Sequence, residues 1–280
     1  MTSTFRKSIL ILALFASVLP SAFASDCDAL YESRAVDEAS TELALDCYVS
    51  QLGTLPDSDR ALKSHAYNRA SYLKFYLGEY FQSGTEQTKL LKQGMEWGEQ
   101  SVLLFGAKYS LNDYKKLSTE ELKLLAEALY AYGLNSSRYI DIKGMPEALI
   151  HMGDIKRSMQ TIIRIKQESI AYYGAHRTLG IFNTVVPGIA GGDLSAAKDY
   201  LLQAITATAD AQGLSQYPAN NVAYAEWLFK SNLRSEACAQ LKLVTELSDD
   251  QVRGLKNGLY LETLSDLKKA KAHWTQYQCS

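Results

Sequence analysis

The chain has 280 residues, of which 47% are hydrophobic and 21% are charged, and its formal net charge at pH 7 is −2. Its 29 lysines and arginines form no basic block and are scattered among acidic residues. The sequence therefore offers no electrostatic basis for holding a nucleic-acid backbone. The length is enough for one elongated helical array or two small domains, and we expect a single domain over residues 25–280.

The first 24 residues have the organisation of a secretory signal peptide. Residues 6–7 form a short basic start, residues 9–19 are an apolar run, and residues 22–24 supply the small side chains that a signal peptidase reads. The run is too short to span about 30 Å of hydrocarbon, and the aspartate before Cys27 does not fit a lipoprotein signal. We expect cleavage after about Ala24, a periplasmic protein that is not a lipoprotein, and no transmembrane segment after cleavage. The alternative is an uncleaved membrane anchor.

All four cysteines follow the predicted cleavage site. An even number of cysteines in an oxidising compartment predicts two disulfides, for which three pairings exist. We favour Cys27–Cys47 and Cys238–Cys279, because each pair ties neighbouring helices at one end of the array, where a helical stack frays most readily. The alternative is four reduced, buried thiols. None of the four has the spacing of a metal site or a redox motif.

The rest of the chain has the periodicity of helices. Apolar residues recur at three and four positions, and no stretch of alternating Val, Ile and Thr indicates a strand. The sequence predicts an all-α protein with about ten to eleven helices. We expect them over residues 28–52 (with a break near Ala35), 57–82, 85–107, 118–140, 146–168, 170–186, 193–211, 219–231, 233–247, 249–258 and 261–278.

Two pairs of helices in the C-terminal half have the spacing of a tetratricopeptide-type hairpin. Ala197, Leu201 and Ala204 lie five, nine and twelve residues after Gly192, and the same offsets recur after Asn232. In such hairpins the second helix packs closely on the first. The spacing predicts a tetratricopeptide-like helical-hairpin array, an α-solenoid, with irregular repeats.

One hairpin carries an insertion at its tip. Gly180 takes the small position of the first helix, but it lies twelve residues before Gly192, where the repeat expects seven. Five extra residues, including Pro187, therefore lie at the tip, and insertions in a repeat map to one face that is often the binding face. Gly191, Gly192 and Asp193 lack the lysine and the preceding strand of a phosphate loop, so they predict a tight turn and a helix cap.

Several short blocks between residues 135 and 247 resemble a known family. The blocks are Asn135 to Tyr139, Lys143-Gly144, Tyr173-Gly174-Ala175-His176-Arg177 with Leu179-Gly180, Pro187, Gly191-Gly192-Asp193 with Ala196-Ala197, and Tyr224-Ala225-Glu226. In these blocks the chain resembles the T component of TRAP transporters (TatT-like), a family of periplasmic tetratricopeptide-like helical proteins. The resemblance covers about half of the mature chain.

The resemblance implies an accessory, non-enzymatic role in solute uptake. Members of the family associate with the substrate-binding P component of a transporter that moves small organic acids by ion coupling, and their fold encloses a central pore suited to a ligand. The implied partner is a periplasmic solute-binding protein of a TRAP-type transporter, and the implied ligand is a small organic acid. Family members are often lipoproteins, whereas this chain lacks the lipid-attachment motif. We expect no cofactor.

His176 and Arg177 are the most suggestive polar pair. On a helix they point about 100° apart, so at most one of them faces a groove. Arginine can bind a carboxylate with two parallel hydrogen bonds, and a buried histidine can orient it. The alternative is that Arg177 ties the Pro187 insertion to the stack through backbone carbonyls.

Five further residues are candidates for contact with a ligand or partner. Tyr139, Tyr173 and Tyr224 offer an apolar ring with a hydrogen-bonding tip, although tyrosines at helical spacing are more often core residues. Asn221, near a helix start, is suited either to a polar group of the ligand or to capping that helix. Arg138 is suited to an anion or to the carbonyls at the end of its own helix.

Signals for catalysis are weak. The four histidines are widely separated without metal-ligand spacing, and no Gly-x-Ser-x-Gly elbow is present. We therefore expect no metal and no catalytic residue, and an enzyme is the least favoured reading. The leading hypothesis is an accessory protein of solute uptake that docks a substrate-binding protein. The alternative is a periplasmic protein–protein interaction scaffold in cell-envelope assembly.

Overall fold

The computed structural model describes residues 20–253 and 259–280 of the chain, and these residues form an all-α fold. They contain thirteen α-helices and one 3₁₀ turn, and the described residues form no strand, with one isolated bridge between Ala209 and Ser215. The first seven helices are α1 (Pro20–Glu32), α2 (Glu38–Thr54), α3 (Arg60–Tyr80), α4 (Gly84–Leu103), α5 (Leu111–Tyr114), α6 (Thr119–Lys143) and α7 (Met145–Arg164). The others are α8 (Gly174–Val185), η1 (Gly188–Ala190), α9 (Leu194–Thr206), α10 (Ala219–Lys230), α11 (Arg234–Thr245), α12 (Asp249–Arg253) and α13 (Leu259–Gln276). The predicted all-α class is confirmed; the tetratricopeptide-like solenoid and the single domain over 25–280 stay predictions.

The predicted signal peptide lies for the most part outside the described residues, since the description begins at Pro20 with α1. Within residues 20–253 and 259–280, no helix is both long and apolar enough to span a membrane.

The described residues contain thirteen α-helices, two more than the upper bound of the predicted ten to eleven. The break that the sequence predicts near Ala35 is confirmed: it separates α1 from α2, and Asp37 caps α2 by accepting a hydrogen bond from the Ser40 backbone at 2.7 Å. The helix that was not predicted is α5, a single turn capped by Ser110. Four residues are too few to produce a periodic apolar pattern, so periodicity does not predict this turn.

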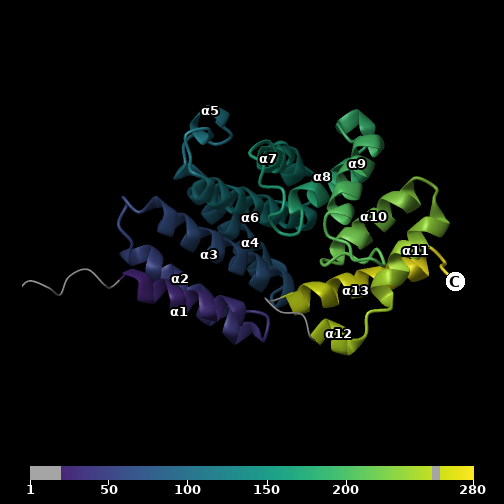
Figure 1. The fold of residues 1–280 in the computed structure, drawn as a ribbon, viewed down its shortest axis with the longest axis horizontal. Helices are drawn as coiled ribbons and strands as arrows, with labels where there is room; N and C mark the ends of the chain where they lie inside the picture. Colours follow the sequence, from purple (N-terminus) through teal and green to yellow (C-terminus); the bar gives the residue numbers. More distant parts are fainter. Residues whose placement is uncertain (1–19, 254–258) are drawn as a thin grey trace, which may run out of the picture.

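The helices pack mainly on their neighbours in chain order (Figure 1). Helices α2, α3, α4, α6 and α7 form successive contacts, and α8 packs on α9 as α10 packs on α11. The last helix, α13, returns along the array and packs on α10 and α11. Its first half lies next to the end of α3 in Figure 1, and the Tyr72 hydroxyl of α3 donates to Glu262 of α13 at 2.6 Å.

Two disulfides close the two ends of this array. Cys27–Cys47 joins α1 to α2, and Cys238–Cys279 joins α11 to the segment that follows α13. Both predicted pairings are confirmed. The bonds close loops of 20 and 41 residues, for which restriction of the unfolded chain stabilises the fold by about 3–4 kcal/mol each.

The two predicted C-terminal hairpins are present as packed helix pairs. Ala197, Leu201 and Ala204 are fully buried, as are their counterparts in α11. A Cβ atom on Gly180 would lie 2.4 Å from the Leu201 side chain, so α8 and α9 approach each other through the missing side chain. Gly180 is therefore the small position that the spacing predicts.

The insertion between α8 and α9 forms an irregular elbow. The Pro187 carbonyl accepts hydrogen bonds from Ala190 and Gly192, Gly191 has a φ of 93°, and Asp193 caps α9 by accepting from two backbone N–H groups. The predicted turn and cap are confirmed. A Cβ on Gly192 would lie 1.8 Å from the Val186 carbonyl oxygen, so the tight turn requires glycine at this position.

Helix α8 begins later than the predicted residue 170. Three consecutive residues before it, Ala171, Tyr172 and Tyr173, have φ values of 51°, 54° and 61°. Left-handed backbone is uncommon for residues other than glycine and costs of order 1–3 kcal/mol per residue. Because of this strained turn, α8 begins only at Gly174, and Tyr172 lines the cavity described next.

Candidate binding cavity

A cavity with two chambers lies between the array and α13. Chamber A has a volume of about 260 Å³ and chamber B of about 330 Å³. Both are lined by Tyr72 of α3, Tyr130 of α6 and Tyr217 of the loop before α10, which we call the tyrosine partition. The charged and amide residues that line chamber A are Glu32, Arg34, Asn68, Arg69, Glu127 and Glu262. The charged residues that line chamber B are Glu79, Arg138, Asp141, Arg177, Glu226, Asp266 and Lys269.

Arg177 of α8 holds the partition in place. It is 6% exposed, donates from Nη2 to the Tyr130 hydroxyl at 2.8 Å, and lies with its guanidinium 4.4 Å from the centroid of the Tyr217 ring. Its Nη1 donates to Oδ1 of Asn220 at 2.8 Å. The side chain therefore joins α6, α8 and α10 at the centre of the cavity.

No carboxylate in the described part of the chain forms an ion pair with Arg177. Its hydrogen-bond acceptors are uncharged oxygens of Tyr130, Asn220 and Ala171, and no carboxylate oxygen lies within 4.0 Å of its nitrogens. A buried charge is normally paired. The guanidinium is thus suited to an anionic group entering chamber B.

Helix α13 contributes two buried acids, four residues apart and on one face of the helix. Glu262 is 3% exposed and accepts a hydrogen bond from the Tyr72 hydroxyl, so it positions Tyr72 in the partition. Asp266 is 7% exposed, and its Oδ2 has no hydrogen-bond partner among the described residues. Burial raises the pKa of Asp266 to about 7, against the opposing attraction of Lys269 and Arg177.

Chamber A is dominated by tyrosine and arginine. The guanidinium groups of Arg34 and Arg69 lie 4.1 Å and 4.4 Å from the centroid of the Tyr31 ring. Tyr172 stacks on Tyr217 with ring centroids 5.5 Å apart and an interplanar angle of 9°. These contacts pre-position the lining side chains, which lowers the entropy cost of binding a ligand.

The structure brings two of the predicted site residues to the same chamber. Arg138 and Arg177 both line chamber B, where Arg138 forms an ion pair with Glu79. The alternative prediction for Arg177, that it ties the Pro187 insertion to the stack through backbone carbonyls, is wrong. The side chain contacts Tyr130, Asn220 and the Ala171 carbonyl, and none of its hydrogen bonds reaches the Pro187 insertion.

Four other predicted residues lie away from the cavity lining. His176 is 3% exposed and packs between the rings of Tyr173 and Tyr200, and burial lowers its pKa. Tyr139 packs edge-on against His151. Tyr224 stacks on Trp227 with centroids 5.6 Å apart. These contacts are those of core aromatics, the alternative that the sequence left open.

Asn221 closes a loop. Its Oδ1 accepts from the Ser215 backbone, and its Nδ2 donates to the Gly213 carbonyl and to Gln240, each within 2.9 Å. It neither caps α10 nor lines the cavity. The neighbouring Asn220, which the sequence analysis did not select, is the residue that meets Arg177.

Sequence reasoning also missed the buried polar residues of α3 and α13, among them Asn68, Glu262 and Asp266. A signal was present for the last two, since acids at i and i+4 on the apolar face of α13 contradict the expected pattern of a packed helix. Their partners lie far away in the chain, so the pattern alone did not place them at a cavity.

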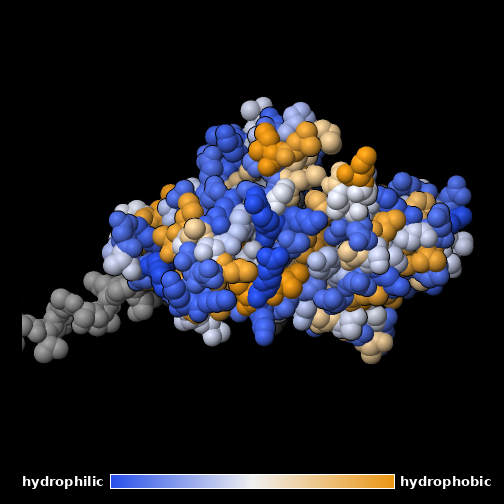
Figure 2. All heavy atoms as spheres, turned by 90° about the horizontal axis from the view of Figure 1, so that it is seen from above, coloured by the Kyte–Doolittle hydropathy of each residue, from blue (hydrophilic) through white to orange (hydrophobic). Residues whose placement is uncertain are grey.

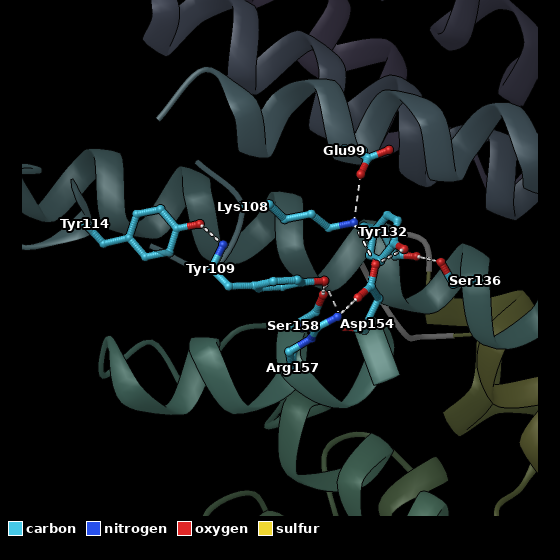
Figure 3. Close-up of polar contacts among 9 residues, drawn as sticks. All are labelled: Glu99, Lys108, Tyr109, Tyr114, Tyr132, Ser136, Asp154, Arg157 and Ser158. Carbon is cyan, nitrogen blue, oxygen red and sulfur yellow. Dashed lines mark hydrogen bonds and ion pairs between the residues drawn. The ribbon is translucent and has the colours of Figure 1, made fainter. Parts of the chain in front are cut away.

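A second polar cluster, around Lys108, is shown in Figure 3, and none of the residues drawn there lines either chamber. The Lys108 ammonium reaches between Glu99 of α4, at 2.8 Å, and Asp154 of α7, at 3.2 Å, and lies 4.0 Å from the Tyr132 ring centroid. Arg157 also pairs with Asp154. Every charge in this Lys108 cluster has an opposite charge in contact, so it fastens the segment after α4 and offers nothing to a ligand.

In residues 20–253 and 259–280, no group of His, Cys, Asp and Glu side chains has the arrangement of a metal site. Neither a protein-family model nor a curated protein matches the chain.

Proposed function

We propose that this chain is a non-enzymatic, periplasmic accessory protein of solute uptake that holds a small organic acid in its central cavity and docks a solute-binding protein. The proposal combines the export signal and the resemblance to the T component of TRAP transporters with one structural observation, the buried Arg177 at the tyrosine partition. A buried cation that lines a cavity, with no carboxylate of a described residue in contact, supports an anionic ligand.

Exposed apolar side chains beside chamber B support the docking half of the proposal. Met152 and Ile155 of α7 and Val185 of α8 line the chamber. The first turns of α7 expose Met145 (69%), Leu149 (72%) and Ile150 (68%), and η1, which follows α8, exposes Ile189 (102%). We call these four residues the rim. On the mostly hydrophilic face shown in Figure 2, hydrophobic residues form separate groups, some at the upper edge and others among the hydrophilic residues across the face. Exposed apolar groups of this kind mark surfaces for protein partners.

A pull-down from periplasm with tagged protein tests the proposal. We expect recovery of a solute-binding protein with the wild-type chain and its loss with the double variant Leu149→Ser and Ile150→Ser. Val36→Ser is the matched control, because Val36 is 74% exposed between α1 and α2, far from the rim in the chain. Absence of any solute-binding protein from the wild-type eluate counts against the proposal.

The rim also favours the second candidate, a scaffold in cell-envelope assembly. The same pull-down separates the two, because envelope-assembly proteins in place of a solute-binding protein would favour the scaffold. Genes for TRAP membrane subunits next to the gene of this chain would favour uptake.

A further inference from the structure

Two buried groups of opposite charge line chamber B without touching. Arg177 of α8 and Asp266 of α13 both line it, and both are more than nine-tenths buried. Neither forms an ion pair within 4.0 Å with a described residue. Burial opposes the charge of Arg177, but attraction from Tyr130, Asp266 and other groups raises its pKa above the ordinary value. The guanidinium is therefore charged, and it interacts with Asp266 at a distance.

Arg177 has hydrogen-bond donors left for an anion. Its hydrogen bonds use both N–H groups of Nη1 and one of Nη2, so the Nε–H and the second Nη2–H have no acceptor among the described residues. Unlike the fully buried Nε of Arg69, the Nε of Arg177 keeps accessible surface. Of the two chambers, Arg177 lines only chamber B. A carboxylate in chamber B is therefore suited to these donors.

Asp266 has no comparable support for its charge. Its Oδ2 is fully buried and receives no hydrogen bond from a described residue. Burial raises the pKa of Asp266 to about 7, although Lys269 and Arg177 attract the charged form. Glu262, one turn earlier on α13, disfavours the charge, and the Ala219 N–H favours it. Near pH 7 the charged and the neutral forms of this side chain are therefore both populated.

The other groups around Asp266 hold their charge states differently. Arg138 is paired with Glu79, and Glu226 with His273. Burial raises the pKa of Asp141 too, but Arg138 opposes this and the side chain is only half-buried. Helices α11 and α12, which also pack on α13, contribute no described charged residue to chamber B. Burial raises the pKa of the nearby tyrosines, which stay neutral near pH 7: Tyr80, Tyr130 and Tyr217.

A ligand carboxylate at Arg177 would be a second anion in the same chamber as Asp266. When two carboxylates share a buried site, the charge of each disfavours ionisation of the other, so one of them binds a proton. The ligand carboxylate has the donors of Arg177, whereas Oδ2 of Asp266 has none, so the proton belongs on Asp266. Asp266 acts through its charge in the low-dielectric interior and not through contact with the ligand.

We infer that a carboxylate ligand enters chamber B together with one proton, which Asp266 takes up from solvent. The negative charge of the ligand and the proton cancel, so binding leaves the net charge of the chamber unchanged. A rise in pH then releases the ligand. This inference rests on the proposed function, because it states how the site for the organic acid is regulated. The alternative is that Asp266 stays ionised and the exposed Lys269 compensates it, which predicts binding that is independent of pH.

Isothermal titration of the full chain tests the inference. Straight-chain carboxylates from acetate to octanoate, together with benzoate, are titrated at pH 6, and the one that binds most tightly is the probe. These acids are fully ionised above pH 6. With Asp266 titrating at about 7, we expect the probe to bind about tenfold more weakly at pH 8 than at pH 6. Titrations at pH 7 in two buffers of different ionisation enthalpy should show uptake of about half a proton per ligand.

The outcomes separate this inference from the proposed function. Equal affinities at pH 6 and pH 8, without proton uptake, overturn the inference and leave the proposed function intact. If none of these acids binds, both the inference and the ligand-binding half of the proposed function fail. The pull-down tests the docking half separately.

Two variants assign the proton. Asp266→Asn keeps the shape of the side chain and removes its charge, so it should bind the probe equally well at pH 6 and pH 8 and take up no proton. Asp154→Asn, in the Lys108 cluster, is the control and should keep the wild-type affinity and pH dependence. If Asp266→Asn still loses about tenfold in affinity between pH 6 and pH 8, the proton binds elsewhere and the inference is overturned.

Discussion

The Lys108 cluster and the cavity contain the same kinds of residue in opposite electrostatic states. Around Lys108, each charge is in contact with an opposite charge and lies partly in water. Around the tyrosine partition, Arg177 and Asp266 are more than nine-tenths buried and have no ionic contact with any described residue. An ion pair compensates both of its charges, whereas a buried charge without an ionic partner keeps a desolvation cost even where, as for Arg177, neutral oxygens accept its hydrogen bonds. The comparison therefore indicates that the charged residues of the cavity are not arranged for maximal stability of the fold.

The largest effect is expected for Arg177→Ala. The change leaves Tyr130 and Asn220 without their shared donor and opens a void at the partition, so we expect the free energy of unfolding to fall by about 3 kcal/mol. Urea denaturation measures it. A loss below about 0.5 kcal/mol, typical of a surface substitution, would show that Arg177 does not hold the partition.

Asp266→Asn is expected to raise the free energy of unfolding instead of lowering it. Because burial raises the pKa of this acid from 3.8 to about 7, the folded state binds its proton more tightly than the unfolded state does. Its ionisation therefore lowers stability as pH rises from about 4 to 7, and the full cost is present above 7. We expect the variant to be more stable than the wild type by about 2 kcal/mol at pH 8 and equal to it near pH 4. Equal unfolding free energies at pH 8 would contradict the raised pKa.

Lys108→Met is expected to lower the free energy of unfolding by less than Arg177→Ala does. The Lys108 ion pairs are partly exposed, so removal of the charge should cost about 1 kcal/mol or less, and the loss should shrink in high salt. Denaturation of the wild type and the variant at low and high ionic strength measures it. A loss as large as that of Arg177→Ala would remove the distinction between the two regions.

The smallest effect concerns His273, which lies 2.9 Å from Glu226. The hydrogen bond to Glu226 raises the pKa of His273 above 6.5. Its contribution to stability is complete below pH 6.5 and is lost as pH rises through the raised value. His273→Gln should remove this pH dependence of Tm between the two pKa values, and an unchanged slope would contradict the assignment.

The features that the sequence predicted are those carried by local spacing. The buried positions of α9 and α11, the close approach at Gly180 and the cap at Asp193 all follow from offsets within about 40 residues. The disulfide pairing was predictable for a similar reason, since each bond joins two cysteines near the same end of the chain, 20 and 41 residues apart.

The cavity was not predictable in the same way. Glu262 meets Tyr72 across 190 positions of the sequence, and no periodic pattern reports such a contact. The strained turn before α8 was also missed, because nothing in Ala171, Tyr172 and Tyr173 favours a left-handed backbone. Arg138 and Arg177 were selected for their charge. Only the tertiary structure distinguishes them, since Arg138 is paired with Glu79 whereas no carboxylate in residues 20–253 and 259–280 contacts Arg177.

Native mass spectrometry of protein purified without unfolding tests most directly whether the cavity binds a small molecule. The expected spectrum shows the chain with one additional small mass, which is lost on acid denaturation and is absent from Arg177→Gln. A spectrum of the bare chain alone, unchanged after addition of small organic acids at millimolar concentration, would contradict a binding role for the cavity.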